Sequence, residues 1–79
     1  MKLRIMYFAK LRDLASTSDE TVVYGGQTVS DLMETLMKTH PGLLNAGKIM
    51  FAVNEQFVSP SAKLKDGDVV ALLPPLNGG

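Results

Sequence analysis

The sequence predicts a single α+β domain in two layers, with one amphipathic helix on one face of a mixed sheet of four to five strands. Three observations support this fold class. The chain has 79 residues, which suffices for one hydrophobic core but not for two. One segment near the middle repeats apolar residues at helical spacing, and short β-branched runs lie on both sides of it. A single helix covers only one face of a sheet, so we expect two layers.

The first strand is expected over residues 2–8. Successive side chains of a strand point to opposite faces, so one alternating set should enter the core: Leu3, Ile5 and Tyr7. The segment AKLRDLA that follows fits either one helical turn or a compact loop. The β-branched run ETVVY predicts a second strand that forms an antiparallel hairpin with the first.

The main helix is predicted over TVSDLMETLMKTH, residues 28–40. Its apolar face consists of Val29, Leu32, Met33, Leu36 and Met37, with both methionines interpreted as core residues. Thr28 and Asp31 have the spacing of a capping box. Pro41 and Gly42 are expected to end the helix.

The second half of the chain predicts three short strands. PGLLNAGK is a loop or short helical turn whose leucines pack under the domain, and IMFAV is predicted to be a buried strand. Asn54 and Glu55 form a tight turn before the short strand QFV. A polar loop with Leu64 as an apolar plug leads to a turn at KDGD, where Gly67 supplies a positive φ.

The last strand, VVALL, is apolar on both faces and is therefore placed in the centre of the sheet. We expect it to lie beside the first strand and parallel to it. That arrangement is a β-grasp, the ubiquitin-like roll, formed by a single domain over residues 1–79 with residues 74–79 as an extended tail.

The composition disfavours several classes of function. Eight basic and eight acidic residues cancel, which argues against a nucleic-acid binder. The absence of cysteine excludes disulfides and thiolate chemistry and fits a reducing compartment. Arg4, Lys10 and Arg12 interrupt any apolar N-terminal run, so we predict no signal peptide, no membrane span and a cytoplasmic location.

The individual candidate residues do not predict a self-sufficient active site. His40 is the only histidine and is interpreted as a helix-capping or solvated residue, so no metal site is expected. Asp66 and Asp68 are interpreted as turn residues. YGGQT lacks the lysine and spacing of a phosphate loop, and no nucleophile adjoins a base.

A mixed aromatic and basic stretch follows the first strand, at Phe8, Lys10 and Arg12. Two interpretations stay open for it: a solvated face beside a core aromatic residue, or a docking patch for a partner protein.

The tail, PPLNGG, suggests a chemical role for the end of the chain. Pro74 and Pro75 cannot continue the hydrogen-bonded ladder and favour a stiff, extended form. Six residues at roughly 3.3 Å each reach about 20 Å. The carboxylate of Gly79 becomes a good acyl donor only after activation, and glycine leaves its carbonyl open to attack. The terminus could therefore act as an acyl carrier.

Over its whole length the chain resembles the small, sulfur-carrying subunits of molybdopterin synthase, a ubiquitin-like family. The most specific pieces are Phe8-Ala9 with Arg12, Ala52-Val53-Asn54, Asp66-Gly67-Asp68, and Pro74-Pro75 followed by Gly78-Gly79. The chain departs from the family where no glycine follows Arg12 until Gly25, and where Asn77 replaces the usual threonine or serine.

The resemblance implies a sulfur carrier in molybdenum cofactor synthesis. An adenylating enzyme related to the ubiquitin activators would use ATP to activate Gly79, and a sulfur donor would then convert it to a thiocarboxylate. The large synthase subunit would use that sulfur to build the molybdopterin dithiolene, in a heterotetramer of two small and two large subunits. The chain would not be catalytic alone but would supply sulfur to a sulfurtransferase, without a permanently bound cofactor.

The resemblance also suggests which residues meet a partner. These are Phe8, Arg12, Pro74, Pro75, Leu76, Asn77 and Gly78. Three alternatives stay open: a sulfur carrier for thiamin or for tRNA thiolation, a ubiquitin-like modifier conjugated through Gly79, and an interaction domain whose tail is inert.

Overall fold

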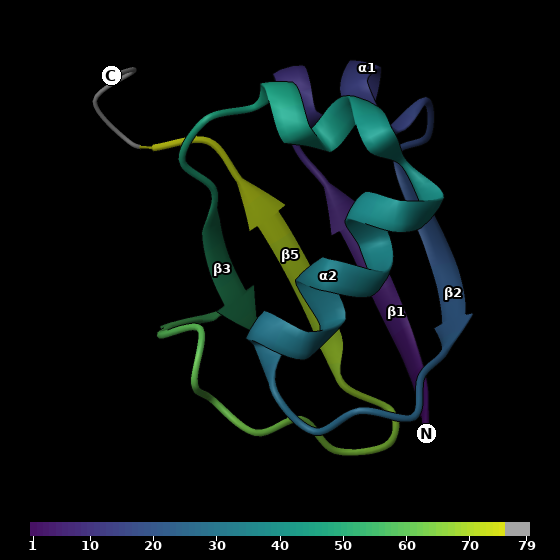
Figure 1. Ribbon diagram of the computed structural model, residues 1–79. Coiled ribbons are helices and arrows are strands. Elements are labelled where there is room, and N and C mark those ends of the chain that lie inside the picture. The colour runs from purple at the N-terminus through teal and green to yellow at the C-terminus, as the bar shows by residue number, and fades with distance from the viewer. Residues whose placement is uncertain (76–79) are drawn as a thin grey trace.

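The computed structural model describes residues 1–75 and contains five strands, two α-helices and one 3-10 helix (Figure 1). The elements in chain order are β1 (Lys2–Tyr7), α1 (Lys10–Ala15), β2 (Asp19–Val23), α2 (Val29–Thr39), η1 (Pro41–Asn45), β3 (Met50–Val53), β4 (Gln56–Val58) and β5 (Val69–Leu73). The predicted order of elements is confirmed. The open alternatives at AKLRDLA and PGLLNAGK both resolve as short helices.

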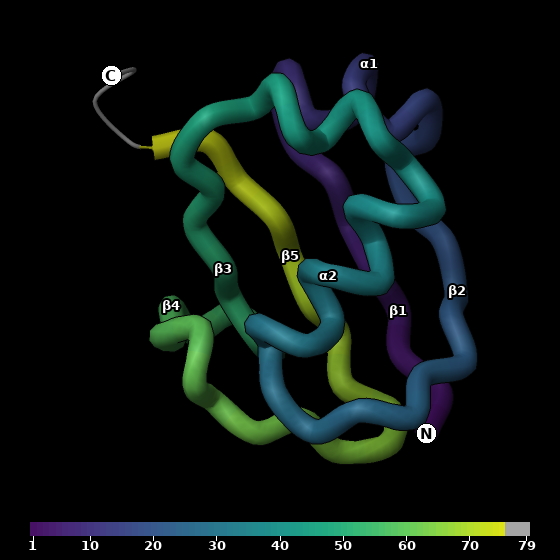
Figure 2. The backbone as a smooth tube through the Cα atoms, viewed as in Figure 1, coloured from purple at the N-terminus to yellow at the C-terminus, as the bar shows by residue number. Residues whose placement is uncertain are grey.

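The five strands form one mixed sheet in the order β2-β1-β5-β3-β4 (Figure 2). β5 lies in the centre, parallel to β1 with Ile5 opposite Val70, and antiparallel to β3. β1 and β2 pair antiparallel, as do β3 and β4. The predicted β-grasp topology, with the last strand parallel beside the first, is confirmed.

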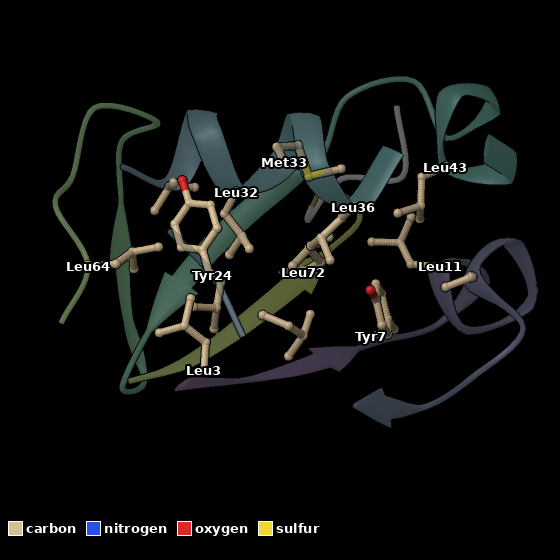
Figure 3. Close-up of a cluster of buried hydrophobic side chains, with 14 of the residues drawn as sticks. Leu3, Tyr7, Leu11, Tyr24, Leu32, Met33, Leu36, Leu43, Leu64 and Leu72 are labelled. Atoms are coloured by element: carbon tan, nitrogen blue, oxygen red, sulfur yellow. The ribbon is translucent and has the colours of Figure 1, made fainter. Parts of the chain in front are cut away.

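The core lies between α2 and one face of the sheet, here called the inner face (Figure 3). The helix contributes Leu32, Met33 and Leu36, and the sheet contributes its alternating set of buried side chains. That buried set is Leu3, Ile5, Tyr7, Val70 and Leu72. The opposite, outer face carries no helix, and apart from the small Ala52 its side chains are half-buried or exposed.

Two predictions about burial are wrong in part. Residues 49–53 were expected to form a buried strand, but within β3 only Ala52 is buried, because this strand lies near the edge beside the short β4. In η1 Leu43 is fully buried, whereas Leu44 is 66% exposed and does not pack under the domain.

The predicted start of α2 is confirmed. The Thr28 side chain accepts a hydrogen bond from the Asp31 N–H, and the Asp31 carboxylate accepts one from the Thr28 N–H, which completes the capping box. Before the helix, the Tyr24 hydroxyl donates to the Thr28 carbonyl at 3.0 Å. A side chain at Gly26 would collide with that hydroxyl. Gly26 in YGGQT is therefore needed for close packing against Tyr24 rather than for a phosphate loop.

A polar cluster joins the edge strand β2 to the end of α2. One carboxylate oxygen of Glu20 accepts from the Tyr7 hydroxyl at 2.6 Å and lies 2.6 Å from His40 Nε2. The rings of Tyr7 and His40 meet edge to face, with centroids 5.8 Å apart. Of the two alternatives for His40, the structure confirms helix capping: His40 is the C-cap residue of α2, and its side chain pairs with Glu20 and is only 17% exposed.

The cluster predicts a loss of stability at alkaline pH. Burial, then the hydrogen bond to Glu20 and the charge of Glu20, raise the pKa of the Tyr7 hydroxyl far above its ordinary value. Above about pH 10 the unfolded chain therefore gives up this proton first, and the free energy of unfolding falls as the pH rises. Below that pH the contribution is fully present.

Urea denaturation between about pH 8 and about pH 11 checks this expectation. Tyr7→Phe should show a shallower decline than the wild type. Tyr24→Phe is the variant for comparison, since burial and the charges of Asp31 and Glu34 raise the pKa of Tyr24 as well. The free energy of unfolding should therefore still fall with rising pH when either tyrosine is replaced alone. Parallel declines of wild type and Tyr7→Phe would contradict the expectation.

Candidate functional site

The candidate site begins where β5 ends. The Phe8 N–H donates to the Leu72 carbonyl at 3.1 Å, and Met50 of β3 stands opposite Leu73. The ladder therefore holds β5 from both sides up to its last residue, and the strand ends at Leu73, before Pro74, as predicted. Pro74 and Pro75 are half-buried at this edge of the sheet.

Four of the predicted site residues follow Pro75. Leu76, Asn77, Gly78 and Gly79 lie outside the described residues, so their roles stay predictions from the sequence.

A shallow hollow of about 500 Å³ lies on the outer face of the sheet. Its lining comes from β1 and the residue after it, from β5, and from the turn between β3 and β4: Met6, Phe8, Asn54, Glu55, Val69 and Ala71. Ala71 stands directly opposite Ala52 of β3 on this face. The small side chain of Ala71 leaves room in the lining between Met6, Phe8 and the turn.

Phe8 and Arg12 take different places around this hollow. Phe8 is 39% exposed and lines it, so the aromatic ring is presented on the outer face rather than buried in the core. Arg12 is exposed on α1 and does not line the hollow. The structure therefore separates the predicted patch into an apolar part on the sheet and a basic part on the short helix.

The turn that separates these parts occurs at Ala9. Its backbone has φ 53° and ψ −133°, a conformation that residues other than glycine rarely adopt. It directs the chain from β1 into α1 immediately after Phe8. Sequence reasoning missed this feature because alanine gives no signal of a positive φ.

The far rim of the hollow is fixed by a side-chain pair. Asn54 Nδ2 donates to Asp68 at 2.9 Å, and Asn54 Oδ1 accepts from the Val69 N–H at 3.0 Å. Asp68 is buried and also accepts from the Lys65 N–H at 2.8 Å. The turn prediction for these residues is confirmed, and Gly67 has the expected positive φ of 88°. The pairing of Asn54 with Asp68 was not predicted.

No three histidine, cysteine, aspartate or glutamate side chains within residues 1–75 gather as a metal site would require. Backbone N–H groups of Thr28 and Gln27 lower the pKa of Asp31, which belongs to the helix cap. None of the helices in the described range has the length and apolar character needed to cross a membrane.

Comparison with known sequences identifies one matching family model, described as the ThiS family, over residues 5–79. A curated relative, the molybdopterin synthase sulfur carrier subunit of Chlamydomonas reinhardtii, is 41% identical over 100% of both chains. The protein of the same name from Escherichia coli is 34% identical over 98% of this chain and 99% of its own.

Three solved structures are similar to this chain over nearly its whole length. A putative molybdopterin converting factor subunit 1 from Pyrococcus furiosus superimposes with a TM-score of 0.86 at 34% identity, covering 96% of this chain and 99% of its own. SAMP1 from Haloferax volcanii gives 0.83 at 27% identity over 100% of both chains. A complex of subunits 1 and 2 of the molybdopterin-converting factor from Helicobacter pylori contains a chain that gives 0.71 at 25% identity, also over 100% of both.

The strained turn gives a prediction for stability. Ala9→Gly should raise the free energy of unfolding by about 1 kcal/mol, because glycine adopts this backbone conformation without strain. Ala62→Gly, at a half-buried position without a positive φ, is the control and should be destabilising. Chemical denaturation of the two variants measures both effects, and a destabilised Ala9→Gly variant would show that the turn is unstrained.

Proposed function

The chain belongs to the ThiS family, and we propose that it works as the sulfur carrier subunit of molybdopterin synthase. The observation that carries this proposal is the sequence Pro74-Pro75-Leu76-Asn77-Gly78-Gly79 at the end of the central strand. Full-length similarity to relatives named for this function supports it.

The chemistry of the carrier resides in the carboxyl group of Gly79. As a carboxylate it is a poor acyl electrophile, since a carboxyl at a chain end ionises at about pH 3.5. A separate adenylating enzyme would join it to the α-phosphate of ATP and release pyrophosphate. A sulfur donor would then attack the acyl carbon and displace AMP, which leaves a thiocarboxylate. ATP is consumed at that enzyme, and the carrier itself needs no resident cofactor.

The domain contributes a rigid base for this terminus. β5 is hydrogen-bonded on both sides, and its inner-face side chains Val70 and Leu72 are fully buried. Pro74 and Pro75 then remove two backbone donors, so the segment beyond them cannot rejoin the ladder. Gly78 and Gly79 carry no side chain that would obstruct a narrow cleft. Residues Pro74 to Gly78 are the part of the tail that would contact the walls of the partner's cleft.

The proposed partner is the large subunit of molybdopterin synthase. The Helicobacter pylori structure holds subunits 1 and 2 together, and its chain resembling this one supports the same pairing here. We assign the hollow on the outer face, with Phe8 at its edge, as the apolar part of the docking surface, and Arg12 as a polar contact beside the tail. Two copies of each subunit would form a heterotetramer.

A ubiquitin-like protein modifier is the second candidate function. The likeness to SAMP1, whose full name in a related structure is small archaeal modifier protein 1, favours it. Such a modifier would use the same adenylated Gly79 but transfer it to lysine side chains. Sulfur carriers for thiamin or for tRNA thiolation share the fold and the tail and would differ in their partners.

We propose a cytoplasmic location for this reaction. The activation step requires ATP and a reduced sulfur donor, and the chain contains no cysteine that an oxidising compartment would pair.

The carrier reaction predicts a defined change at Gly79. Intact-mass spectrometry of the chain produced with its adenylating enzyme should show one oxygen exchanged for sulfur. Deletion of Gly79 should leave folding and binding of the large subunit intact while abolishing synthase activity. Conjugates on lysines of other proteins, with no sulfur exchange, would favour the modifier instead.

The docking surface gives a second prediction. Phe8→Ser should weaken binding of the large subunit at least about tenfold, because partly exposed aromatic residues at the centre of an interface contribute strongly to affinity. Phe57→Ser is the matched control: Phe57 is 57% exposed on the same sheet but does not line the hollow. Calorimetric titration measures both affinities. Equal losses for the two variants would remove the hollow from the interface.

A further inference from the structure

The ionic side chains are distributed unevenly between the two ends of the sheet. β1 and β5 are parallel and finish at the same edge, where β3 begins, and we call this the tail end (Figure 1). The opposite end holds the starts of β1 and β5 and the turn between β3 and β4. The ion pairs among residues 1–75 are Arg4 with Asp19, whose charges cancel, and His40 with Glu20.

The tail end carries an excess of positive charge. Lys10 lies two residues after Phe8, whose N–H donates to the Leu72 carbonyl near the end of β5. Lys48 lies two residues before Met50, which stands opposite Leu73, the last residue of β5. With Arg12 on α1 and Lys38 in the last turn of α2, four exposed basic residues stand here against one exposed acid, Asp13.

The opposite end carries an excess of negative charge. Asp66 and Asp68 lie in the turn before β5, and Glu55 in the turn before β4. Asp31 and Glu34 lie close enough to Tyr24 for their charges to raise its pKa, and the Tyr24 N–H donates to the Met1 carbonyl. Three lysines and the amino group of Met1 offset these five acids only in part: Lys2, Lys63 and Lys65. With neutral His40, as in the formal net charge of zero, the four basic residues of the tail end exceed Asp13 and Glu20 by two, and the five acids of the opposite end exceed its three lysines by two. The amino group of Met1 and the carboxylate of Gly79 each reduce one of these differences by one.

We propose that Lys10, Arg12 and Lys48, the tail-end basic cluster, dock against an acidic rim around the cleft of the large synthase subunit that receives the tail. This inference rests on the proposed function and adds the chemistry of the surface that surrounds the tail. A positive end directed at an acidic cleft orients the carrier tail-first during diffusion and raises the association rate. The apolar hollow would then complete the contact at short range.

A protein surface fits the cluster better than a small anion does. The three side chains are exposed and come from α1 and from the loop before β3, and none lines the hollow on the outer face. A phosphate site requires converging donors within a pocket, whereas separated surface cations suit the rim of a larger partner.

A charge-reversal pair with a matched control tests the proposal. Lys10→Glu combined with Lys48→Glu reverses two charges at the tail end, and Lys63→Glu combined with Lys65→Glu makes the same change at the opposite end. Stopped-flow association with the purified large subunit of the same organism should slow at least about tenfold for the first variant at low salt. The control should associate as fast as the wild type or faster. The difference should shrink at high salt, as ions screen exposed charges.

Each outcome decides a different point. Equal rates for the two double variants would overturn the cluster as a docking surface. Inhibition of wild-type association by inorganic phosphate beyond that of chloride at equal ionic strength would overturn it in favour of an anion site. A wild-type chain that fails to bind the large subunit at any salt concentration would contradict the proposed function itself. A slow first variant that still supports synthase activity at high concentration would support both.

Discussion

The parallel pairing of β1 with β5 is the constraint on which the rest of the structure depends. It joins the first and last strands in the middle of the sheet, with Ile5 opposite Val70 and both fully buried. Parallel neighbours require a crossover connection, which here brings α2 over the inner face. The outer face then stays open for a partner, and both strands finish at the edge from which the tail leaves. Fold, docking face and tail position follow from one pairing.

Local patterns predicted most of this fold. Alternation in residues 2–8 identified the buried face of β1, and apolar spacing with the Thr28–Asp31 box identified α2. The run VVALL placed β5 in the centre because both of its faces are apolar. The same reasoning overestimated burial in β3, since an apolar run alone does not reveal that the strand lies near the edge of the sheet.

The candidate site depended more on contacts between distant residues, which a sequence pattern does not display. Glu20 reaches Tyr7 and His40 because its position opposite Ile5 turns it to the inner face. The hollow is lined by residues of β1, β5 and the turn between β3 and β4, which are far apart in the chain. The separation of Phe8 from Arg12 follows from the backbone of Ala9, a residue type that usually avoids this conformation. The diglycine end lies outside the described residues, so its role stays a prediction from the sequence.

The central place of β5 also has a consequence for biosynthesis. β5 follows the other described strands in the chain, yet it stands between β1 and β3, so the two halves of the sheet cannot be joined until β5 has been synthesised. Pairing between the two ends of a chain is slow to form, because a long loop must close first. A product terminated before β5 would lack the middle of its sheet. Translation errors of this kind would therefore leave an unfolded chain for proteases instead of a folded but truncated domain.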